Sequence, residues 1–187
     1  MIAIKKGQRG RLAKLLSQSP PGMDINAENG VNGVSPLFKA VALGRGGMVK
    51  LLLACGANPN YVHGKQQVSV LFRSIVEGRE KICELLIDAG ADVSFVNKKG
   101  TSVLTKAINT GMRRIAKLLI AKGAAVNTPL PLIRAAAKGM PNVVIALLRA
   151  GAHPDAVNSK GNTALFTACA NGHPKVAKLL LAAGADV

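Results

Sequence analysis

The chain has 187 residues and a formal net charge of +16, from 25 Lys and Arg against 9 Asp and Glu. There is no Trp, only one Tyr and four Phe, so the interior must be built from Leu, Ile, Val and Ala. No apolar run approaches the ~20 residues needed to cross a bilayer, and the N-terminus lacks the apolar core of a signal peptide. We therefore expect an intracellular protein, cytoplasmic or nuclear, without a membrane span.

The dipeptide Gly-Ala recurs near the end of each leucine-rich run. Its five copies, at 56–57, 90–91, 123–124, 151–152 and 184–185, are 34, 33, 28 and 33 residues apart. A fixed period of this size indicates stacked structural repeats, each packed mainly against its neighbours. Such arrays mostly bind other macromolecules, which favours a binding function over catalysis.

Each repeat is predicted to contain two helices separated by a glycine turn. A short first helix precedes the turn, and a longer amphipathic helix follows it and ends at Gly-Ala, where glycine is a common C-cap. The turn glycines are Gly7, Gly44, Gly78, Gly111, Gly139 and Gly172. The predicted N-caps of the first helices are Ser35, Ser69, Ser102 and Thr163. Pro141 and Pro174 fall in the first turn of a second helix, where proline is tolerated.

In chain order, these elements predict a single domain over residues 1–187. A degenerate unit covers 1–28, and five repeats follow at about 29–61, 62–95, 96–127, 128–156 and 157–187. The repeat at 128–156 is five residues short, and Leu130 stands where its N-cap belongs. We therefore expect a blunted loop before that repeat.

The motifs resemble those of the ankyrin repeat family. The segments GVSPLFKAV at 33–41 and GNTALFTA at 161–168 are similar to the family's opening, and Gly-Ala-Asp-Val occurs at 90–93 and 184–187. The resemblance covers nearly the whole chain. It implies an all-α solenoid of helix-turn-helix units joined by short β-hairpin loops, the fingers. The family's helix-opening His is replaced by Phe38, Phe72, Thr105, Ile133 and Phe166, so we expect apolar packing between repeats instead of hydrogen bonds.

The resemblance implies a non-catalytic protein–protein interaction module that binds through its concave face and finger tips. One first-helix position, which the family pattern places on the concave face, holds Lys39, Arg73, Lys106 and Arg134. The finger tips add Lys65, Lys98, Lys99 and Lys160. Asn109, Lys138 and Asn171 stand near the ends of first helices. These residues predict a partner with an acidic surface or segment, although a merely solvated column of cations remains an alternative.

Catalytic constellations are absent from the sequence. It contains no H-E-x-x-H, no G-x-S-x-G and no Walker-type phosphate loop. We expect structural roles for His63 and His153 in fingers and for His173 in a glycine turn. Glu77, Glu80, Glu84 and Asp88 are predicted to form an exposed stripe on a second helix. The sequence therefore predicts no enzyme, no cofactor and no metal site.

The three cysteines, Cys55, Cys83 and Cys169, form no C-x-x-C pair. An odd number of scattered cysteines in helical stretches indicates buried or half-buried thiols in a reducing compartment.

Two other functions remain open. A polyanion binder, for nucleic acid or a phosphoinositide, would use the same cations, although the few aromatic residues argue against a dedicated reader of single strands. The chain could also be the targeting segment of a larger, truncated protein, because its last repeat lacks the polar cap typical of terminal repeats. We expect a monomer.

Overall fold

The computed structural model describes residues 8, 10, 13–14, 24–28, 33–65 and 67–186. Contacts divide the chain into two compact units, Met1–Thr101 and Ser102–Val187, here called the N-terminal and C-terminal units. The predicted single domain over 1–187 stays a prediction. Most of the degenerate repeat predicted at 1–28 lies outside the described residues.

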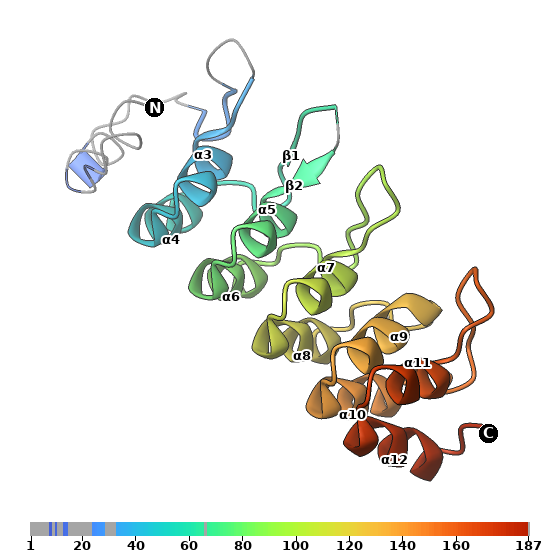
Figure 1. The fold of residues 1–187 in the computed structure, drawn as a ribbon. Coiled ribbons are helices and arrows are strands. Elements are labelled where there is room, and N and C mark those ends of the chain that lie inside the picture. The colour runs from blue at the N-terminus through green and yellow to red at the C-terminus, as the bar shows by residue number, and fades with distance from the viewer. Residues whose placement is uncertain are drawn as a thin grey trace. The chain divides into compact units, whose positions relative to one another are not determined.

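The described part of the N-terminal unit contains two complete helical hairpins and a small β-hairpin (Figure 1). The helices are α3 (Pro36–Ala42), α4 (Gly46–Ala54), α5 (Val70–Val76) and α6 (Glu80–Asp88). The antiparallel strands β1 (Val62–His63) and β2 (Val68–Ser69) form the finger between α4 and α5. The first helices α3 and α5 pack side by side, and the second helices α4 and α6 do the same. Two layers of helices result.

The C-terminal unit repeats this arrangement with three hairpins (Figure 1). They are formed by α7 (Val103–Asn109) with α8 (Arg113–Ala121), α9 (Pro129–Ala137) with α10 (Pro141–Arg149), and α11 (Ala164–Ala170) with α12 (Pro174–Ala182). The middle hairpin contacts both neighbours, because α9 packs on α7 and α11, and α10 packs on α8 and α12.

The interior of both units is aliphatic, as composition predicted. Small residues that are fully buried at one position of the first helices allow close packing: Ala40, Ser74, Ala107, Ala135 and Ala168. Leu71 and Leu104 are typical of the buried leucines three residues before them. This pattern confirms that repeats stack through Leu and Ala faces.

Polar side chains cap four of the first helices as predicted. The hydroxyl oxygens of Ser35, Ser69, Ser102 and Thr163 each accept from the backbone N–H three residues later, at 3.0–3.2 Å. The prediction of Leu130 as an N-cap position was wrong, because α9 begins at Pro129 after Thr128. Proline has its φ preset for a first helical position and needs no N–H partner there, so the helix starts earlier. Residues 122–128 alone link α8 to α9, which is half the length of the linker at 150–163 between α10 and α11, so the finger is blunted as predicted.

The residues at the helix-opening position do not all behave alike. Phe38, Phe72, Thr105 and Ile133 are buried, as predicted. Phe166 is 60% exposed, so the prediction that it packs between repeats was wrong. Phe72 is covered by Phe95 from the following loop, with ring centroids 6.4 Å apart, whereas no described aromatic ring lies against Phe166 in this way.

Candidate functional site

The predicted cations of the N-terminal unit lie on its first helices. Lys39 in α3 and Arg73 in α5 each follow the capping serine by four residues and stand between buried neighbours. Because α3 and α5 pack side by side in the same register, the two side chains share one face. Both residues are half-buried.

Arg73 is already engaged within its own helix. Its Nη2 lies 2.7 Å from Oε1 of Glu77, and its side chain is 38% exposed. Its Nε is buried and has no hydrogen-bond partner among the described residues. Glu77 is the C-cap of α5, so its predicted place on a second helix was wrong. Part of the charge predicted for partner binding is therefore neutralised at this position.

The C-terminal unit presents its cations without nearby helical acids. Lys106 in α7 is half-buried, whereas Arg134 in α9 and Lys138 at the C-cap of α9 are exposed. The helices α7, α9 and α11 contain no Asp or Glu. Since α9 packs between α7 and α11, these cations lie on one continuous layer of helices.

The two predicted asparagines differ in what they do. Asn171 is exposed, and its Nδ2 donates to the Thr167 carbonyl oxygen at 2.7 Å, so it closes the last turn of its own helix α11. Asn109 is the last residue of α7 and is exposed. Asn171 therefore has a structural role at the helix end in addition to any contact with a partner.

The finger lysines lie at exposed turns. Lys65 follows β1, and Lys98, Lys99 and Lys160 occupy two turns of identical construction. The Oδ1 atoms of Asn97 and Asn158 accept from the N–H of Lys99 and Lys160, at 3.0 and 2.8 Å. Sequence reasoning missed these asparagines, although the pattern Asn-x-Lys-Gly at 97–100 and 158–161 was a usable signal.

A second set of polar residues joins the loops of successive repeats. Oδ1 of Asn26 accepts from the N–H of Asn58, and Oδ1 of Asn60 accepts from the N–H of Asp92, each at 2.7 Å. In the C-terminal unit, Asp155 Oδ1 accepts from the N–H of Asp186 at 2.8 Å. These bonds were not predicted. They fix neighbouring loops relative to each other within a unit and so help to preform the finger end.

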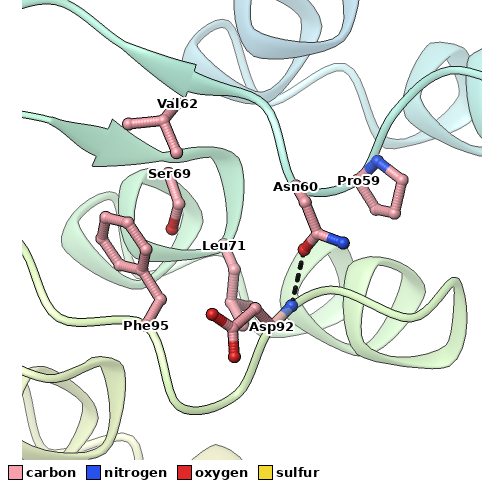
Figure 2. A pocket seen from close by; sticks show the side chains of 7 residues that line it. All are labelled: Pro59, Asn60, Val62, Ser69, Leu71, Asp92 and Phe95. Carbon is pink, nitrogen blue, oxygen red and sulfur yellow. Dashed lines mark hydrogen bonds between the residues drawn. The ribbon is translucent and has the colours of Figure 1, made fainter.

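A shallow hollow of about 110 Å³ lies at the finger base of the N-terminal unit. Figure 2 shows its seven lining residues, with Phe95 and Val62 on one side and the bonded pair Asn60 and Asp92 on the other. None of the predicted contact residues lines it. It is small compared with the cavities of 300–1,000 Å³ that usually hold cofactors, and the exposed Asp92 carboxylate disfavours an anion there.

A family model for ankyrin repeats in three copies matches residues 1–97, 89–158 and 107–187. The chain belongs to the ankyrin repeat family. No curated protein matches it. The match and the helical hairpins confirm the predicted all-α solenoid class. Ankyrin repeats are in general protein–protein interaction modules and are typically non-catalytic.

The histidines of this ankyrin repeat protein have structural contacts, as predicted. His63 stacks near Tyr61 and Phe38, with centroids 6.2 and 4.8 Å away. His173 Nε2 donates to the Ala137 carbonyl oxygen of the preceding repeat at 3.1 Å. Burial, together with the Glu28 carboxylate, raises the pKa of Tyr61. No group of three or more potential metal ligands occurs in the described part of the chain.

The cysteines are free thiols in three different settings. Cys83 is buried 3.0 Å from the Ser74 hydroxyl, and burial raises the pKa of its thiol to about 11. Cys55 and Cys169 are exposed, so the prediction of buried or half-buried thiols was wrong for them. Cys55 is the C-cap of α4, and Cys169 lies in the last turn of α11. Among the described helices, none is long and apolar enough to cross a membrane.

Proposed function

We propose that this ankyrin repeat protein binds an acidic segment of another protein through the open face of its first helices and its finger lysines. The observation that carries the proposal is the group formed by Lys106, Arg134 and Lys138. They lie on the packed layer of α7, α9 and α11, none of which contains an acidic residue.

The arrangement is electrostatically unfavourable for the protein alone. Arg134 and Lys138 are four residues apart, so they face each other across one helical turn. Like charges at this spacing destabilise a helix by about 0.2–0.5 kcal/mol. An acidic ligand would relieve the repulsion and would be attracted over a distance, which raises the association rate. Because the helices are packed in place beforehand, little conformational entropy is lost on binding.

The N-terminal unit contributes less to this binding in our proposal. Lys39, Lys65, Lys98 and Lys99 supply positive charge, but Glu77 already occupies the Arg73 guanidinium. The exposed Asp92 beside the hollow further weakens the local field. We therefore place the main contacts on the C-terminal unit, with Lys160 at its finger.

The test is fluorescence anisotropy of a labelled peptide of alternating Glu and Ser. The triple variant Lys106→Gln, Arg134→Gln, Lys138→Gln should weaken binding by about tenfold to a hundredfold, since exposed ion pairs contribute up to ~1 kcal/mol each. The matched control, Lys117→Gln, Lys175→Gln, Lys178→Gln, removes the same charge from second helices. It should weaken binding only a few-fold through the smaller net charge.

Equal losses in the two triple variants would contradict the proposal. Tighter binding of a DNA duplex than of the peptide at the same salt concentration would favour the polyanion alternative instead. In the opposite direction, Glu77→Gln releases the Arg73 guanidinium and should strengthen peptide binding modestly.

We also propose that the chain is one domain and a monomer in an intracellular compartment. The net charge of +16 supports the monomer, because it makes copies of the chain repel one another. Size-exclusion chromatography with light scattering tests this, and a dimer mass at low concentration would contradict it.

A further inference from the structure

The second helices of the C-terminal unit carry a basic surface that the proposed function does not use. The sequences of α8, α10 and α12 are RRIAKLLIA, PNVVIALLR and PKVAKLLLA, without a single acidic residue. By contrast, α6 in the N-terminal unit is EKICELLID and has three. The two acids of the C-terminal unit, Asp155 and Asp186, lie in loops after α10 and α12.

These three helices form one layer with a covered side and an open side. Each packs on the first helix of its own hairpin, and α10 packs between α8 and α12 (Figure 1). One side of each helix holds buried residues, such as Ile115, Val144 and Val176. The opposite side is therefore open to a partner.

At least four exposed cations occupy the open side. Lys117 on α8 and Lys178 on α12 stand at the same repeat position, six residues after the turn glycine, with the half-buried Ile145 of α10 between them. Arg149 near the end of α10 and Lys175 at the start of α12 are exposed as well. The positive charge is thus spread over three helices in two dimensions rather than along one line.

The residues between the cations are short or apolar. Ala121 and Ala182 are exposed at equivalent positions, and Leu181 on α12 is 47% exposed. These side chains are shorter than those of Lys and Arg, so a flat partner can approach the cations closely. The three helices contain no aromatic residue, and single-stranded nucleic acid binding usually relies on aromatic stacking.

We propose that the second-helix face of the C-terminal unit, formed by Lys117, Arg149, Lys175 and Lys178, docks on a membrane surface rich in anionic lipids. Lipid headgroups diffuse laterally and can match cations spread over a surface, whereas a polynucleotide presents its phosphates at fixed spacing. Exposed Leu181 can enter the interface beside the charges, as apolar residues of membrane-surface helices do. This face lies on the layer opposite the proposed acidic-segment site, so a lipid surface and a protein partner can bind together.

The experiment is sedimentation of the full chain with vesicles. One set consists of phosphatidylcholine alone, and the other is an equimolar mixture of phosphatidylcholine and phosphatidylserine. The chain should sediment with the mixed vesicles only. The variant Lys117→Gln, Arg149→Gln, Lys175→Gln, Lys178→Gln should bind them about a hundredfold to a thousandfold more weakly, because each basic residue near an anionic surface contributes several-fold. All four side chains are exposed, and circular dichroism checks that the variant remains folded.

The matched control removes four charges from the other layer and finger of the same unit: Lys106→Gln, Arg134→Gln, Lys138→Gln and Lys160→Gln. It should keep most of its vesicle binding. Equal losses in both variants would overturn the proposal, because net charge alone would then explain the attraction. Full vesicle binding by the variant of the second-helix face would also overturn it. So would displacement of the wild type from vesicles by a small excess of DNA duplex.

Discussion

In the N-terminal unit, each helix-opening Phe contacts aromatic rings of the loop that follows its hairpin, since Phe38 contacts Tyr61 and His63, and Phe72 contacts Phe95. In the C-terminal unit, the equivalent first-helix positions are Thr105, Ile133 and Phe166, and aliphatic and alanine packing replaces the rings. The difference teaches that the helical hairpins, rather than any particular side chain at this position, define the stack. At the helix-opening position both the residue type and its burial vary, from buried Phe72 to exposed Phe166.

The units also differ in charge. The first 101 residues hold seven of the nine acids, whereas the C-terminal unit has eleven Lys and Arg against two Asp. Because every acid of the C-terminal unit lies in a loop, both layers of its helices remain purely basic. This asymmetry is why the main contacts of both proposed binding surfaces are on the C-terminal unit.

The largest expected effect comes from truncating the helix-opening Phe in each unit. Phe72 is 6% exposed and Phe166 is 60% exposed. Phe72→Ala should lower the free energy of unfolding by about 3–5 kcal/mol, as for other buried Phe, and Phe166→Ala by less than ~1 kcal/mol. Urea denaturation followed by circular dichroism measures both. Similar losses would show that burial does not distinguish the two positions.

The next largest expected effect is on the pH dependence of stability. It distinguishes the buried thiol of Cys83 in the N-terminal unit from the exposed thiol of Cys169 in the C-terminal unit. Burial raises the pKa of Cys83 from 9.0 to about 11, so the folded state favours the neutral thiol. The contribution of the neutral Cys83 thiol to the free energy of unfolding is complete below pH 9. It is lost as the pH rises to 11, because the thiol ionises at a lower pH in the unfolded chain than in the folded one. A shift of this size corresponds to about 2–3 kcal/mol.

Denaturation across this pH range gives the measurement. Between pH 9 and pH 11, the free energy of unfolding of the wild type should fall by about 2–3 kcal/mol more than that of Cys83→Ala. The pH profile of Cys169→Ala should match that of the wild type. Parallel pH profiles for the wild type and Cys83→Ala would contradict the assignment.

The smallest effect compares one turn glycine in each unit. Gly44 and Gly139 have φ of 66° and 57°, so alanine costs about 1–2 kcal/mol at either. At Gly139 the new Cβ would lie 2.7 Å from His173 Nδ1, and at Gly44 it would lie 2.9 Å from Arg79 Cζ. The arginine end can swing away, but the His173 ring cannot move without straining its bond to Ala137. Gly139→Ala should therefore cost about 1 kcal/mol more than Gly44→Ala, the value of one hydrogen bond.

A double-mutant cycle provides the control. In a His173→Ala background, Gly139→Ala should cost no more than Gly44→Ala does in the wild type. If Gly139→Ala still costs more free energy of unfolding than Gly44→Ala in the His173→Ala background, the strain does not come from the imidazole.

Sequence reasoning succeeded for features that depend on a few adjacent residues. The glycine turns and the caps at Ser69 and Thr163 were predicted because a cap bonds to an N–H three residues away. It failed at Thr128, where a proline one residue later changed the helix start. It also placed Glu77 on the wrong helix and so missed its pairing with Arg73, although their spacing of four residues was visible.

The sequence by itself determined the repeat, the family and the two-helix unit, because period, capping and turn residues act over short distances along the chain. Only the tertiary structure decided which equivalent positions are covered. Phe72 is buried and Phe166 is exposed, although each lies three residues after a capping Ser or Thr and directly after a Leu. Burial depends on what packs against a residue from another repeat, and the residue's own neighbours in sequence do not encode that.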